Sequence, residues 1–156
     1  DAALDRLQQA LELDPLYGRP YRLRATLRRE AKDWEAAEAD YRKYVESRDG
    51  AGDAVGWSGL AYVLGQQGKS ADAIEANLEV LKLAGNDLAT LRNLVLLYRD
   101  TGDAPSACAY AEQGLALAPD DAALTQLATE IGCQTTDAGP GAPAGNPSDE
   151  TGDDRP

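Results

Sequence analysis

The feature that most constrains this chain is a pattern of apolar and small residues that occurs twice, in residues 54–87 and again in residues 88–121. Leu60 in the first segment corresponds to Leu94 in the second, 34 residues later, and neighbouring apolar positions correspond in the same way. A fixed period of this length is typical of proteins built from stacked, similar units. The sequence therefore predicts a repeat array.

Each segment contains two runs in which apolar residues recur at helical spacing. Gly68 lies between the runs of the first segment and Gly102 between those of the second, where a reversing chain needs a residue that tolerates positive φ. A helical hairpin of this kind cannot bury its apolar stripe alone and must stack on its neighbours. We therefore expect an all-α solenoid of antiparallel helix hairpins, with the helical runs at residues 57–66, 71–83, 91–99 and 106–117.

The segments on either side extend the array. Residues 1–15 match the second half of a unit, so we expect the second helix of a truncated repeat and a chain that is a piece of a longer protein. Residues 18–53 form a weaker copy, in which Arg24 and Arg28 stand where the later copies have apolar residues. Residues 121–133 predict a capping helix that covers the last hairpin.

The last segment differs in composition from the rest. Residues 134–156 have few apolar residues and many Gly, Pro and acidic residues. Such a segment cannot bury enough surface to offset its ordering entropy, so we expect a disordered acidic tail. One possibility is that the tail is a flexible end without a role. The alternative is that it folds back onto the arginine-rich face of residues 19–32 and occupies the site of a ligand, through Asp149, Glu150, Asp153 and Asp154.

The residues that define the period resemble the tetratricopeptide repeat family. The resemblance covers residues 1–131 and implies a right-handed superhelix whose concave groove is lined by the first helix of each pair. Members of this family mostly bind peptides or helices of partner proteins. The residues that carry the resemblance are Trp57, Leu60, Ala61, Leu64, Gly68, Ala73 and Pro119.

Composition narrows the possible functions. The formal net charge of −12 argues against general affinity for nucleic acid or anionic lipid, and no apolar run is long enough to span a membrane. The chain has no His, which excludes imidazole chemistry. The segment Gly56-Trp57-Ser58-Gly59-Leu60 begins like a nucleophile elbow but lacks the final Gly. We expect no catalytic site, cofactor or metal, and so no enzyme.

Basic residues gather in residues 19–32, where Glu30 is the lone acid. Arg22 and Arg29 share one helix face with Thr26, and the resemblance places that face in the groove. Arginine suits carboxylates because its planar fork matches their geometry. The hypothesis is a groove for an acidic or carboxylate-bearing peptide, and the alternative is a solvated face that balances surplus acids. The predicted contact residues are Arg22, Thr26, Arg29, Ser58, Tyr62, Gln66, Arg92, Asn93, Leu96 and Arg99.

Some family members that bind chaperones hold a C-terminal carboxylate with a set of Lys, Asn and Arg. Gly59 and Ala89 occupy positions that this set requires to be polar or basic, so we exclude that specialised function.

Arg24 and Asp40 lie 16 residues apart, one on each predicted helix of the weaker copy. The segment resembles a variant of the family that carries Arg in the first helix and Asp in the second. We expect a partly buried ion pair with a structural role. The alternative is a solvated Arg and an unrelated Asp.

Cys108 and Cys133 are the two cysteines. If the helices at residues 106–117 and 121–131 are antiparallel about a turn near Pro119, Cys108 lies opposite roughly residue 131 and so close to Cys133. A disulfide there would hold the capping helix in place and imply an oxidising compartment, periplasmic or secreted. The alternative is two free thiols in a cytoplasmic protein.

The sequence thus predicts a protein-interaction scaffold that holds a partner segment in its groove. Two alternatives remain open. The array could be the regulatory or substrate-docking region of a larger enzyme whose catalytic domain lies upstream. It could instead be architectural, and either space domains or self-associate through its open N-terminal helix.

Overall fold

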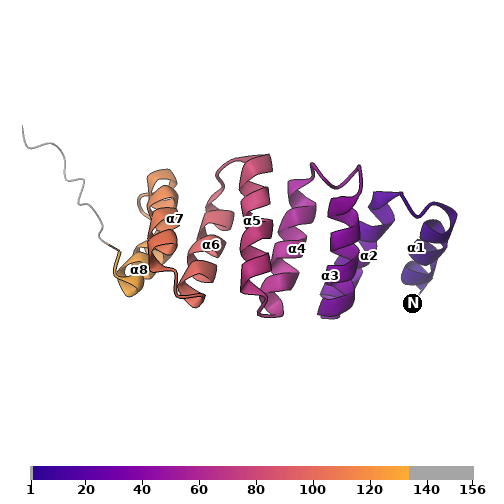
Figure 1. The fold of residues 1–156 in the computed structure, drawn as a ribbon, viewed down its shortest axis with the longest axis horizontal. Helices are drawn as coiled ribbons and strands as arrows, with labels where there is room; N and C mark the ends of the chain where they lie inside the picture. The colour runs from indigo at the N-terminus through magenta and orange to yellow at the C-terminus, as the bar shows by residue number, and fades with distance from the viewer. Residues whose placement is uncertain (1, 134–156) are drawn as a thin grey trace, which may run out of the picture.

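The computed structural model describes residues 2–133, and in these residues the chain forms helices connected by short loops. Figure 1 shows the helices side by side in a single row, from α1 next to the N-terminus to α8 at the opposite end. The acidic tail predicted for residues 134–156 lies outside the described residues. The helices are α1 (Ala2–Leu13), α2 (Gly18–Glu30), α3 (Trp34–Glu46), α4 (Ala54–Gln66), α5 (Ser70–Ala84), α6 (Leu88–Asp100), α7 (Ala104–Leu117) and α8 (Ala122–Ile131).

Consecutive helices pair as antiparallel hairpins, α2 with α3, α4 with α5 and α6 with α7. Each hairpin packs on the next, α3 on α4 and α5 on α6, and α8 closes the row against α7 and α6. Contacts between helices distant in the row are few. The predicted all-α solenoid of helix hairpins is therefore confirmed.

Aspartates set the start of most helices. The carboxylates of Asp33, Asp53, Asp87, Asp103 and Asp121 accept hydrogen bonds from backbone N–H groups in the first turn of α3, α4, α6, α7 and α8. Each satisfies donors that the helix itself leaves unpaired. The same cap therefore recurs along the row and fixes where these five helices begin.

The turn inside each hairpin needs one residue in the left-handed conformation. Gly68 has φ of 70° and Gly102 has φ of 78°, as their positions in the repeat predict. In the first hairpin the equivalent residue is Lys32, with φ of 61°. Sequence analysis missed this, because Lys gives no sign of a left-handed turn.

The core lies between the packed helices, and its largest fully buried side chains are leucines and valines. Leu60, Leu64, Leu91, Leu94 and Leu124 are fully buried. Leu60, Leu64, Leu91 and Leu94 fall at the repeat positions that define the period, and Leu124 belongs to the capping helix. Burial of such apolar side chains favours folding.

Glycines bring α4 close to α3. A Cβ added to Gly59 would lie 2.5 Å from the Tyr41 ring, and one added to Gly56 would lie 2.4 Å from the Tyr44 ring. These distances are below any real carbon contact, so the rings fill the space that a side chain would need. The family position at Gly59 is therefore used for packing, which explains why no ligand-binding polar residue stands there.

The helix α1 is covered on one side alone. Leu11 is buried against α2, whereas Leu13 and Leu16 are 89% and 87% exposed. Self-association through this end stays a prediction. In the part of the chain that the structure describes, no helix has the length and apolar character that crossing a membrane requires.

Candidate partner-binding face

The first helices of the three hairpins, α2, α4 and α6, carry every residue that the sequence predicts to contact a partner. Between α4 and α6 this face is hollowed into a depression of about 340 Å³. Tyr62 and Leu96 line it, with Asn93 and Gln66 beside them and Asn77 of α5 at its inner side. The other residues around it are Ala61, Gly65, Leu97 and Asp100.

Tyr62 is an aromatic residue exposed on this face. It is 51% exposed, whereas most of the large residues of α4 are buried. Asn77, by contrast, is buried and donates through Nδ2 to the carbonyl of Ala73. The depression therefore offers an aromatic surface and several amide groups, a combination suited to a peptide backbone with an apolar side chain.

A second depression, of about 450 Å³, lies at the turn between α2 and α3. It is lined by Arg29, Glu30, Lys32, Trp34 and Tyr62. The Arg29 guanidinium lies over the Tyr62 ring, with its Cζ 5.8 Å from the ring centroid. The Trp34 ring meets Tyr62 edge-on at 6.2 Å between centroids. Sequence analysis missed Trp34 and Lys32 as parts of this face.

Arg22 and Thr26 are directed toward α3. Arg22 stacks over Tyr44, with its Cζ 5.7 Å from the ring centroid, and its Nε is buried without an acceptor. The Thr26 hydroxyl donates to the carbonyl of Arg22 and lies 3.3 Å from the hydroxyl of Tyr41. Both side chains therefore help to hold α2 against α3, and their contact with a partner stays a prediction.

The hydroxyl of Tyr44 donates to Asp53 at 2.6 Å. Burial, followed by this bond to a carboxylate, raises the pKa of Tyr44 to about 12, so the phenol keeps its proton. The bond links the end of the first hairpin to the cap of α4.

Arg92 occupies the position equivalent to Arg22 and pairs with the buried Asp121, the cap of α8. The pKa of Asp121 is lowered by the backbone N–H of Leu124, and Arg92 lowers it further against the effect of burial. Arg99 pairs with the adjacent Asp100 at 2.8 Å. Both arginines of α6 thus form ion pairs with carboxylates of the chain itself.

Ser58 is exposed on α4, and Asn93 and Gln66 are exposed beside the first depression. The ten predicted contact residues therefore divide into two groups. Arg29, Tyr62, Gln66, Asn93 and Leu96 line the two depressions, whereas Arg22, Thr26, Arg92 and Arg99 interact within the chain and Ser58 lies outside both hollows.

Arg24 and Asp40 form the ion pair that the sequence indicates, with Nε and Nη2 donating to the two carboxylate oxygens at 2.8 and 2.6 Å. The Asp40 side chain is 4% exposed. The hydrogen bond to Asp40, the largest effect, raises the pKa of Arg24 against the effect of burial. Arg28 also donates to Asp40, at 2.9 Å. One buried carboxylate thus holds both arginines that replace apolar residues in this hairpin.

Solved structures share this arrangement of helices. MamA superposes with a TM-score of 0.71 at 15% identity, over 83% of this chain and 77% of that one. YrrB, described as a TPR protein with an unusual peptide-binding site, superposes with a TM-score of 0.63 at 19% identity, over 81% and 62%. A chain of the APC/C hetero-tetramer Cut9–Hcn1 gives 0.66 at 17% identity, over 81% and 26%. This chain has the tetratricopeptide repeat fold.

At these identities the likeness concerns the tetratricopeptide repeat fold alone. The described chain spans less than two thirds of YrrB and about a quarter of the Cut9–Hcn1 chain. A scan against protein-family models finds no match, and a search of curated proteins finds no relative.

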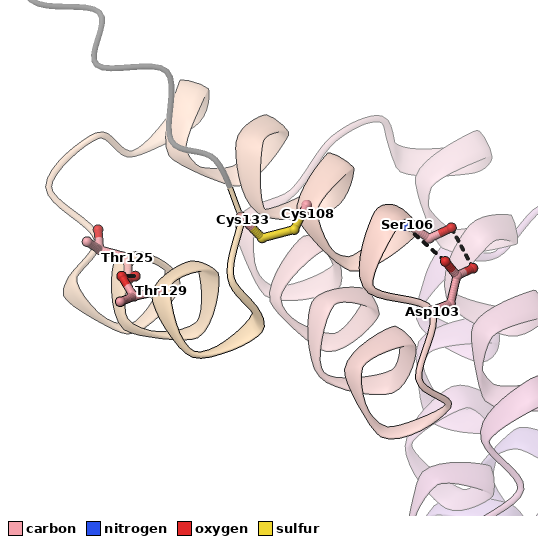
Figure 2. Close-up of a disulfide and its surroundings, with 6 residues drawn as sticks. All are labelled: Asp103, Ser106, Cys108, Thr125, Thr129 and Cys133. Carbon is pink, nitrogen blue, oxygen red and sulfur yellow. Dashed lines mark hydrogen bonds between the residues drawn. A yellow bond between two sulfur atoms is a disulfide. The ribbon is translucent and has the colours of Figure 1, made fainter.

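The capping helix of this tetratricopeptide repeat array is tied to the last hairpin by a disulfide. Figure 2 shows the bond between Cys108 on α7 and Cys133 just after α8. Their Cα atoms are 5.3 Å apart, within the range that a disulfide requires. Leu124 and Ala128 of α8 are buried beside Val95 and Ala111, so the bond fixes the helix that covers this end of the core.

A charge network on the second helices of the repeats was missed by sequence analysis. Glu38, on α3, accepts hydrogen bonds from Lys69 at 2.6 Å, Arg42 at 2.9 Å and Gln67 at 2.7 Å. Burial raises the pKa of Glu38, but these bonds outweigh burial and the net pKa is lowered. The i,i+4 spacing of Glu38 and Arg42 was the available signal. Among residues 2–133, no group of three or more His, Cys, Asp or Glu is placed to hold a metal ion.

Proposed function

We propose that this chain is a protein-interaction scaffold, which holds an acidic segment of a partner protein against the face formed by α2, α4 and α6. The observation that carries the proposal is the position of Tyr62. This half-exposed aromatic ring lies between two depressions, each lined by side chains able to bind a peptide. Exposed aromatic residues at the centre of such a face are typical anchors in protein interfaces.

The charges of the face support an acidic partner. Arg29 and Lys32 line the second depression, and neither forms an ion pair with the residues that the structure describes. Arg24, Arg28, Arg92 and Arg99 are already paired, so these two cations are better placed to meet an incoming carboxylate. The likeness to a peptide-binding TPR protein, YrrB, agrees with a peptide ligand.

Interaction, rather than catalysis, is the role that these side chains suit. In the described residues, Arg92 and Arg99 pair with carboxylates of the chain, and Arg22 and Arg29 stack on aromatic rings. Such groups orient a ligand, whereas nucleophilic catalysis needs a nucleophile bonded to a base.

Selection from a random-peptide library on the immobilised full chain tests the proposal. We expect enriched peptides that combine Asp or Glu with a large apolar residue and bind more weakly at high salt. Tyr62→Ala should weaken the selected peptide about tenfold, the loss that corresponds to 1.4 kcal/mol at an anchor residue.

Val55→Ala is the matched control, because Val55 is an exposed apolar residue of the same helix and lines neither depression. Equal losses for the two substitutions, or selected peptides without acidic residues, would contradict the proposal.

A further inference from the structure

We propose that the depression at the turn between α2 and α3 is a carboxylate subsite, which receives an Asp or Glu side chain of the bound partner. The inference rests on the proposed function. It adds where an acidic residue of the partner binds, which side chains donate to it, and that the bound group is a carboxylate. The subsite consists of Arg29, Lys32, Trp34 and Tyr62, with Glu30 at its edge.

The charge balance of the subsite favours an anion. Arg29 and Lys32 supply two positive charges and Glu30 one negative charge. Neither cation forms an ion pair with the residues that the structure describes, whereas Arg24 and Arg28 of α2 share Asp40. An incoming carboxylate would therefore meet cations that do not need to leave another partner.

The aromatic rings determine how Arg29 can act. Its guanidinium lies over the Tyr62 ring, with Cζ 5.8 Å from the centroid, and a guanidinium placed over a ring can still donate its N–H groups to a ligand. A planar guanidinium held in this way can donate two parallel hydrogen bonds to a carboxylate. The Trp34 ring, edge-on to Tyr62, offers an apolar surface for the aliphatic stem of a Glu side chain.

The same stacking argues against a cationic ligand. Aromatic residues bind cations through the face of the ring, and Arg29 already lies over the face of Tyr62. A second cation would also lie close to Arg29 and Lys32, with Glu30 alone to offset the repulsion.

The backbone of Lys32 provides an independent observation. Its φ of 61° is the one positive value at a residue other than Gly among the described residues, and the equivalent turns use Gly68 and Gly102. A side chain in this conformation is unfavourable, and such strain gathers where a residue contributes to function. Here the strained residue is one of the two cations of the subsite.

Tyr62 lines both depressions of the face. A segment that crosses Tyr62 would therefore place its acidic residue over the end of α2 and its apolar residue between α4 and α6. The proposal thus gives the bound segment a direction along the array.

Nuclear magnetic resonance of the ¹⁵N-labelled full chain tests the subsite, because its two Trp residues give two indole signals. Trp34 lines the subsite, whereas the indole of Trp57 donates to the carbonyl of Ala51 outside it. The probes are N-acetyl-Glu-Leu-amide and the uncharged N-acetyl-Gln-Leu-amide. We expect the Glu probe to shift the Trp34 signal, with little change at Trp57 and a much smaller effect of the Gln probe.

Three substitutions separate the subsite from general electrostatics. Arg29→Gln and Lys32→Gly should each weaken the Glu probe about threefold to fivefold, the range for losing one partly exposed charge pair. Lys43→Gln removes an equal charge from an exposed residue of α3 that lines neither depression, and should leave binding unchanged. Lys32→Gly also relieves the turn, so loss of folding cannot explain its effect.

Equal shifts from the two probes, an unmoved Trp34 signal, or equal losses for Lys43→Gln and Arg29→Gln would each overturn the carboxylate subsite. So would a stronger response of Trp34 to inorganic phosphate than to the Glu probe, because it would indicate a general oxyanion site. Failure of the proposed function looks different: the Glu probe would still act at Trp34, but library peptides would leave Asn93 and Leu96 undisturbed.

Discussion

Lys32 shows how one residue can conflict with the local rule of the fold. It holds the left-handed position that Gly68 and Gly102 hold in the later hairpins. We predict that Lys32→Gly raises the free energy of unfolding by about 0.5–1 kcal/mol. The substitution removes the strain of a side chain at positive φ, and the greater conformational entropy of Gly in the unfolded chain offsets part of this gain. Urea denaturation measures the change.

Lys32→Ala is the control for this prediction. It removes the charge but retains a Cβ at positive φ, so it should give no comparable gain in stability. A gain from Lys32→Ala equal to that from Lys32→Gly would show that the charge, and not the backbone, is responsible.

Glu38 should make stability depend on pH. The pKa of Glu38 in the folded protein is lowered from its ordinary value of 4.5. The ionised side chain therefore adds to the free energy of unfolding in full above pH 4.5, and this contribution is lost as the pH falls through the folded pKa. We predict that Glu38→Gln reduces the fall in unfolding temperature between about pH 5 and pH 3. Thermal unfolding across this range measures it.

Glu35→Gln, at an exposed position of the same helix, serves as the comparison for Glu38. If both substitutions change the pH profile to the same extent, the hydrogen bonds from Lys69 and Arg42 do not account for the effect.

Residue-level reasoning from sequence succeeded where two residues were sufficient to define an interaction. Arg24 and Asp40 could be paired from their positions in the repeat, and Cys108 could be placed level with Cys133 from helix geometry. The role of Arg28 could not be predicted, because sharing Asp40 depends on side-chain paths across the hairpin.

At the scale of helices, close packing of α3 and α4 depends on the absence of a side chain at Gly59. We predict that Gly59→Ala lowers the free energy of unfolding by about 1–3 kcal/mol, the usual cost of overpacking, because the new Cβ would overlap Tyr41. Gly65→Ala is a matched control on the same helix, where nothing lies within 4 Å of the added carbon.

At Gly65 the substitution should stabilise the protein by about 0.5–1 kcal/mol, because Ala is the better helix former. Chemical denaturation of the two variants compares them directly. If Gly65→Ala lowers the free energy of unfolding as much as Gly59→Ala does, overlap with Tyr41 is not the cause of the loss at Gly59.

The disulfide should act mainly on α8. Replacing Cys108 and Cys133 by Ser is expected to lower the free energy of unfolding by about 2–4 kcal/mol, the usual range for closing a loop of this size. Amide exchange should accelerate most in residues 122–131. Dithiothreitol should have the same effect on the natural protein and none on the double variant, and an unchanged exchange rate in α8 would contradict the account.

For the whole molecule, the period of the sequence was sufficient to predict the architecture. Leu60 and Leu94 lie 34 residues apart and are both buried at equivalent places in successive hairpins. In such a stack each hairpin contacts its neighbours in the same way. The architecture of the whole array therefore follows from the pattern of one repeat.

The accessible residues on the face of α2, α4 and α6 were harder to predict, because the same helix face contains both packed and accessible side chains. Arg22 and Arg92 occupy equivalent positions and were predicted as ligand contacts, yet one stacks on Tyr44 and the other pairs with Asp121. Trp34 belongs to a different helix from the predicted contacts, and the packing of α3 on α4 brings it beside Tyr62. Such neighbours become visible only in three dimensions.

The most direct test of the central claim is hydrogen–deuterium exchange of the full chain with and without a library-selected acidic peptide. The account predicts that the peptide slows exchange in α4 and α6, at the end of α2 and at the turn into α3, with little change in the rest of α3, in α5 and in α7. Protection concentrated in α3, α5 and α7, or in α1 alone, would contradict the claim that the face of the first helices holds the partner.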